Sequence, residues 1–161
     1  MRLAEQGLRQ PKAGVLYALL LISGCASPSA PAWWLRTPDG QLRSAWLGKS
    51  LTATPLESGS PPHYADSLGR VFRYLPPLGG VLWIEYYAQQ DTICSITLTW
   101  EHTEFAALAK VYQELRTYYT HIYASPQGPP GKLRWHTSDS LEIRLWLSPE
   151  KRYLHNAWIK K

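Results

Sequence analysis

Polar and apolar side chains alternate in the second half of the chain, and this pattern predicts β-strands. In residues 92–100, Cys94, Ile96, Leu98 and Trp100 are separated by hydroxyl-bearing side chains. A period of two is typical of a strand with one buried and one solvated face. The alternation therefore predicts that Cys94 faces the core.

Other runs rich in β-branched and aromatic residues predict further strands, and Pro, Gly, Ser and Asp separate them. The predicted strands cover residues 71–75, 81–87, 132–136, 141–147 and 153–159. A further short strand is expected at 41–47, in a stretch where no period persists. We expect residues 52–67 to form a loop.

Between the two groups of strands, apolar residues recur every three or four positions and predict a helix over residues 103–123. Thr103 is the expected N-cap, with Glu104 in the first turn, and the Pro- and Gly-rich residues 126–131 end the helix. The apolar stripe consists of Phe105, Leu108, Tyr112, Leu115, Tyr119 and Ile122.

These elements predict an α+β domain built on an antiparallel sheet in the order β3-α-β3, meaning three strands, a helix and three strands. The single long helix packs on one face of the sheet. Residues 33–161 form this domain, with an irregular N-terminal segment over residues 33–70. Its length suits one hydrophobic core.

Strand register can be predicted by keeping charges out of the core. A three-residue loop at 89–91 sets Tyr86 opposite Cys94, whereas a two-residue loop would bury Glu85. A turn around Pro149 similarly sets Trp146 opposite Tyr153, and so Arg144 beside His155.

The outward side chains of this sheet define a candidate binding surface. Aromatic residues and Arg anchor protein interfaces, although a platform for stacking sugars would use the same residues. The alternative is that residues 33–75 fold back and cover this face. The candidate residues are Trp83, Tyr87, Arg144, Trp146, Tyr153 and His155.

Candidate chemistry is sparse, so we predict a non-enzymatic protein with no catalytic residue, metal or cofactor. The five histidines lie on different predicted elements without ligand spacing. Cys94 is expected in the core, where it is unsuited to act as a nucleophile. Glu85 and Glu142 share the outward face, but with Arg144 beside them a salt-bridge ladder is favoured over a pair of catalytic carboxylates.

The beginning of the chain has the pattern of an export signal. Arg2, Arg9 and Lys12 precede an apolar stretch at 13–22, which is too short to span a bilayer. The tetrad Ile22-Ser23-Gly24-Cys25 follows it and resembles the lipobox of bacterial lipoproteins. The resemblance covers residues 1–25 only.

The resemblance implies a signal peptide at 1–24 and a lipid-modified Cys25 that anchors the protein in a membrane. Residues 25–32 would be an extended tether. Bacterial lipoproteins retained in the inner membrane carry Asp after the cysteine. Here Ala26 follows, so the resemblance favours the periplasmic side of the outer membrane.

Charge and composition narrow the expected partners. Three of the 17 Lys and Arg and one of the 12 Asp and Glu lie in residues 1–24, which leaves a net charge of +3. This charge is too small and scattered for nucleic acid. The leading hypothesis is an accessory lipoprotein that binds another envelope protein in an assembly or secretion system. An immunity protein or inhibitor of a toxin or wall hydrolase, and a protein that binds or hydrolyses wall glycan, are the alternatives.

Overall fold

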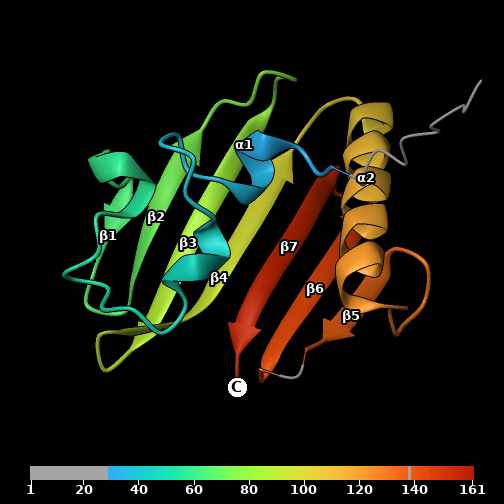
Figure 1. Ribbon diagram of the computed structural model, residues 1–161. Coiled ribbons are helices and arrows are strands. Elements are labelled where there is room, and N and C mark those ends of the chain that lie inside the picture. The colour runs from blue at the N-terminus through green and yellow to red at the C-terminus, as the bar shows by residue number, and fades with distance from the viewer. Residues whose placement is uncertain (1–28, 138) are drawn as a thin grey trace, which may run out of the picture.

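A seven-stranded antiparallel sheet forms the centre of the molecule, which the computed structural model describes over residues 29–137 and 139–161. Its strands are ordered β1-β2-β3-β4-β7-β6-β5 (Figure 1). Two antiparallel meanders therefore meet where β4 pairs with β7. The strands are β1 (Tyr64–Ala65), β2 (Gly69–Tyr74), β3 (Val81–Gln89), β4 (Thr92–Glu101), β5 (Lys132–His136), β6 (Leu141–Ser148) and β7 (Tyr153–Lys160).

One long helix, α2 (Phe105–Tyr123), packs across β5, β6 and β7, so the fold is α+β as expected. Within residues 29–137 and 139–161, three strands follow this helix but four precede it, because the two-residue β1 adds to the expected three. Short helices lie on the same side of the sheet over its other half (Figure 1). They are α1 (Ala32–Leu35) and the 3₁₀ helices η1 (Arg43–Trp46) and η2 (Leu56–Gly59).

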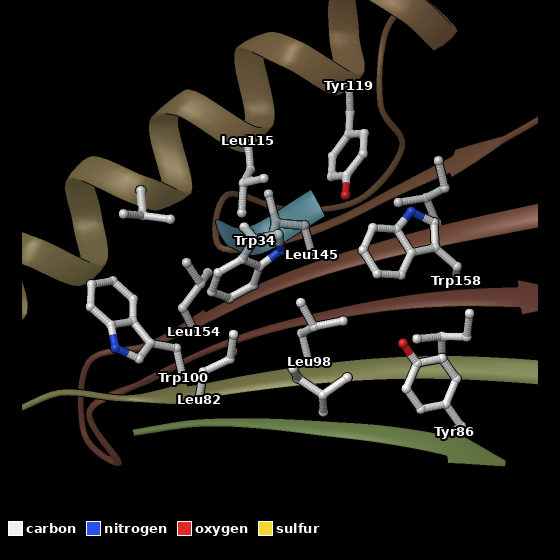
Figure 2. Close-up of a cluster of buried hydrophobic side chains, with 14 of the residues drawn as sticks. Trp34, Leu82, Tyr86, Leu98, Trp100, Leu115, Tyr119, Leu145, Leu154 and Trp158 are labelled. Atoms are coloured by element: carbon white, nitrogen blue, oxygen red, sulfur yellow. The ribbon is translucent and has the colours of Figure 1, made fainter. Parts of the chain in front are cut away.

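The core lies between the sheet and these helices (Figure 2). Trp34 of α1 is fully buried and packs edge-on against Trp100 of β4, with ring centroids 6.5 Å apart. The buried residues of α2 are Leu108, Val111, Tyr112, Leu115 and Tyr119, so most of the predicted stripe faces the sheet. Its two ends do not, because Phe105 and Ile122 remain 42% and 47% exposed.

A buried ion pair ties the N-terminal segment to the sheet. The guanidinium of Arg43 donates two hydrogen bonds of 2.8 Å to the carboxylate of Glu57, and both residues are buried. The hydroxyl of Tyr86 on β3 donates to the same carboxylate at 2.5 Å. Arg43 also donates to the carbonyl oxygens of Trp33 and Trp34, so its charge is fully engaged.

Two local expectations are wrong. Residues 41–47 do not form a strand, because the chain turns into η1 and thereby directs Arg43 inward to Glu57. The N-cap of α2 is Glu104 rather than Thr103. The backbone N–H of Glu104 itself donates to Nδ1 of His102, and among the described residues no side-chain hydrogen bond caps the helix.

Candidate functional site

The face of the sheet opposite the helices carries the candidate residues, and we call it the open face. The helical part of the N-terminal segment, residues 32–59, packs on the helix side, where Trp34 and Glu57 are buried. Farther along the segment, His63 contacts Trp83 of the open face. In the part of the chain that the structure describes, no helix lies over the open face (Figure 1). Its side chains include Arg73, Trp83, Glu85, Tyr87, Ser95, Thr97, Thr99, Lys132, Arg134, Glu142, Arg144, Trp146, Tyr153 and His155.

The open face brings four of the six candidate residues together. Trp146 on β6 lies directly opposite His155 on β7, with Arg144 two positions along β6 and Tyr153 two positions along β7. Trp83 and Tyr87 lie on β3, on the far side of β4 from these four. The predicted surface is therefore one sheet face with two aromatic groups on it.

The imidazole of His155 stacks on the indole of Trp146, with ring centroids 4.5 Å apart and an interplanar angle of 28°. Its Nδ1 lies 3.0 Å from the hydroxyl oxygen of Thr99, at hydrogen-bond distance. Burial, and to a smaller extent the positive charge of Arg144, lowers the pKa of His155 to about 4. The imidazole is consequently neutral at physiological pH, which suits a ring packed face to face against an indole.

The carboxylate of Glu142 is held by cations rather than paired with another acid. Lys161 donates to it at 2.9 Å, and Arg144 donates to its other oxygen. These hydrogen bonds, with that of Lys161 first, lower the pKa of Glu142 to about 2. Glu85 lies on β3, with β4 and β7 between it and Glu142, so the two carboxylates cannot act as a catalytic pair.

The second aromatic group lies over β2 and β3. Trp83 contacts the ring of His63 edge-on, with centroids 5.3 Å apart, and Tyr87 is 43% exposed. Between this group and the Trp146–His155 stack runs a row of hydroxyl side chains from β4. That row consists of Ser95, Thr97 and Thr99.

A groove of about 680 Å³ lies at the end of the open face where the β6–β7 turn meets the start of β5. Trp146 and Tyr153 line it together with three exposed cations, Lys132, Arg134 and Lys151. We call it the basic groove. The remaining lining residues are Leu147, Ser148, Pro149 and Glu150.

The predicted registers of both hairpins are wrong by two residues. A shift of two leaves each side chain on the face of the sheet that was predicted for it, and Cys94, at the bulge, is the exception. Tyr86 pairs with Ile96, not with Cys94. Trp146 pairs with His155 rather than Tyr153, because the connection from β6 to β7 spans four residues and sets Ser148 opposite Tyr153. Arg144 accordingly pairs with Ala157.

Cys94 is half-exposed instead of buried, because it is the extra residue of a β-bulge. Ser95 pairs with Tyr87 and Ile93 with Ala88, so Cys94 has no partner across the ladder. The turn between β3 and β4 has two residues, Gln90 and Asp91, both at positive φ. The bulge shifts the alternation by one residue and keeps Glu85 outside despite the short turn.

The Lys and Arg residues of the basic groove were not among the sequence candidates. The sequence did indicate that Lys132 and Arg134 point outward, because they alternate along β5 with Leu133 and Trp135, which face the core. Lys151 belongs to a turn, and no periodicity places it near Lys132. Only the pairing of β5 with β6 brings these cations to one groove.

Neither a metal centre nor a membrane-spanning helix is found in the described residues. Over 29–137 and 139–161, His, Cys, Asp and Glu form no group of three or more that could bind a metal ion. No helix in these ranges has the length and apolar character needed to cross a bilayer. Cys25, the predicted lipid attachment site, lies outside the described residues.

Comparison with protein-family models, curated proteins and solved structures finds no match to this chain.

Proposed function

We propose that the protein is a membrane-anchored envelope lipoprotein, without enzymatic activity, that binds another envelope protein through its open face. It would serve as an accessory of an assembly or secretion system. The observation that carries this proposal is that the helical part of the N-terminal segment, residues 32–59, packs on the helix side of the sheet and leaves the open face around Trp146 uncovered. Large exposed surfaces that combine aromatic and polar groups commonly mark interaction sites.

The residues of the open face support a protein partner. Trp, Tyr and Arg are the side chains most often found as interface hot spots. Trp146 lies on the open face between Arg144, two positions along β6, and Tyr153, diagonally across on β7. All three are partly exposed. The neighbouring Lys132 and Arg134 extend this cluster with positive charge, which favours a partner with an acidic contact surface.

The anchor rests on the sequence of residues 1–25. A charged start, a short apolar stretch and a cysteine after small residues support export and lipid attachment at Cys25. Attachment through several acyl chains is effectively permanent. The binding face would then act close to a membrane surface, on the periplasmic side of the outer membrane if Ala26 directs sorting as the lipobox resemblance implies.

Lipid attachment is tested with the Cys25→Ser variant. In cells supplied with labelled palmitate, the wild-type chain should take up the label and the variant should not. The variant should remain uncleaved or be released from the membrane fraction. A Cys25→Ser chain that is still labelled would overturn the anchor.

Partner binding is tested by affinity purification of the lipidated protein from membranes, with mass spectrometry of the proteins that copurify. Trp146→Ala should weaken capture of the specific partner by about 2 kcal/mol or more with little change in melting temperature. Phe105→Ala is the matched control, because it removes an exposed aromatic side chain from the helix side. If both variants capture the same proteins as the wild type, or if Trp146→Ala unfolds the domain, the open face is not the binding surface.

A further inference from the structure

The basic groove differs from the rest of the open face in its charge. Lys132 and Arg134 are both exposed at outward positions of β5, and Lys151 projects from the β6–β7 turn. In the ranges that the structure describes, no carboxylate lies within the 4.0 Å ion-pair distance of these three side chains. Glu150 is the acidic residue in the groove lining.

Two other cations near β6 are already engaged. Arg144, which pairs with Arg134, and Lys161, beyond the end of β7 away from the groove, both bind the carboxylate of Glu142. The positive charges available to an acidic ligand therefore differ between two parts of this surface. One part is neutralised by Glu142, and the other part, in the basic groove, presents charges without an ion-pair partner among the residues that the structure describes.

The floor of the basic groove is rigid and aromatic. Trp146 is held by its stack on His155, and His155 is oriented by Thr99. Tyr153 lies opposite Ser148 at the same end of the ladder. A pre-formed floor lowers the entropic cost of binding, and about 680 Å³ is within the usual size range of ligand sites.

We propose that the basic groove receives an acidic segment of the partner protein, with its carboxylates paired to Lys132, Arg134 and Lys151 and its apolar side chains packed on Trp146 and Tyr153. This inference rests on the proposed function and specifies the chemistry of the partner. Paired carboxylates and cations would set the orientation of the segment. The aromatic floor would supply apolar contact area, which charge pairing alone does not provide.

The proposal is tested with a random decapeptide display library panned against the detergent-purified full chain. Peptides retained by the wild type should be enriched in Asp and Glu, and their affinities should fall as salt is raised. Each of Lys132→Glu, Arg134→Glu and Lys151→Glu should weaken binding of a selected acidic peptide by about tenfold or more. Lys110→Glu is the matched control, because Lys110 is an exposed cation on α2, on the helix side of the sheet and outside the open face, and should leave binding unchanged.

Several results would overturn the proposal. Retained peptides without enrichment in acidic residues would do so, as would acidic peptides that bind the three groove variants as tightly as the wild type. Competition by a soluble uronic-acid oligosaccharide, without acidic peptide enrichment, would assign the groove to a saccharide instead. If the groove variants still capture the membrane partner while Trp146→Ala does not, this inference fails and the proposed function stands.

Discussion

The indole of Trp34 donates a hydrogen bond of 3.0 Å to the side-chain oxygen of Asn156, although the two residues lie 122 positions apart. The hydroxyl of Tyr119 donates to the same oxygen at 2.6 Å, and the side-chain amide of Asn156 donates to the carbonyl of Arg144 at 2.9 Å. Asn156 is fully buried. This one amide therefore joins α1, α2 and two neighbouring strands within the core.

Replacing Asn156 with Leu should destabilise the fold by about 2 to 5 kcal/mol, because two buried donors lose their acceptor. Urea unfolding monitored by circular dichroism measures this cost. Tyr119→Phe is the control, since it removes one donor and keeps Asn156. It should cost about 1 kcal/mol. A Leu variant as stable as the wild type would contradict the assigned role of Asn156.

The contributions of Arg43 and Glu57 to the free energy of unfolding should be strongly coupled. Arg43→Met or Glu57→Leu alone should cost about 3 to 5 kcal/mol, because each leaves a buried polar or charged group without its partner. The double variant Arg43→Met, Glu57→Leu should cost less than the sum of the single variants. A double-mutant cycle by chemical denaturation measures the coupling, and additive costs would show that the pair is not coupled.

The stability of the protein should fall on acidification through the titration of His155. Its pKa is about 4 in the folded state against 6.5 as the ordinary value, so between these pH values the unfolded chain binds a proton that the folded chain does not. The contribution of His155 is complete above pH 6.5 and is lost progressively down to pH 4. Allowing for its partial exposure, the loss is about 1 to 2 kcal/mol.

This pH dependence is measured by urea unfolding at several pH values down to about 5, where Glu142, with its much lower pKa, stays charged in the fold. His155→Gln is the comparison variant, and its stability should change less over the same interval. Equal slopes for the two proteins would show that another group is responsible.

The thiol of Cys94 should react with a thiol reagent in the native protein, more slowly than after unfolding. It is half-exposed at the bulge, and its Sγ donates to the carbonyl of Tyr87 at 3.5 Å. The Cys25→Ser chain isolates this signal, because the sequence contains two cysteines. Complete native protection would show that the bulge is absent in solution and that Cys94 faces the core.

Local periodicity in the sequence was sufficient to predict most of the sheet. The bounds of β5 are those predicted, because its polar and apolar residues alternate regularly and turn-forming residues lie on both sides of it. The register of β3 and β4 could not be predicted, since the bulge at Cys94 is a single-residue irregularity that alternation cannot reveal. A regular strand with a three-residue turn also keeps Glu85 out of the core, so the sequence alone favoured that arrangement.

The N-terminal segment was unpredictable for a different reason. Its position depends on contacts such as Arg43 with Glu57 and Trp34 with Asn156, which have no periodic signature. For the same reason the sequence left open which face the segment covers. The candidate residues of the open face were identified from strand phase, whereas the basic groove requires the tertiary pairing of β5 with β6.

Both edges of the sheet are poorly suited to pairing with a further strand. At one edge β1 has only two residues. At the other, the outward N–H groups of Lys132 and Arg134 already donate to the carbonyls of Pro129 and Gln127. Short or already bonded edge strands protect a protein from edge-to-edge aggregation. The sheet therefore offers its side-chain faces to contacts more readily than its backbone edges.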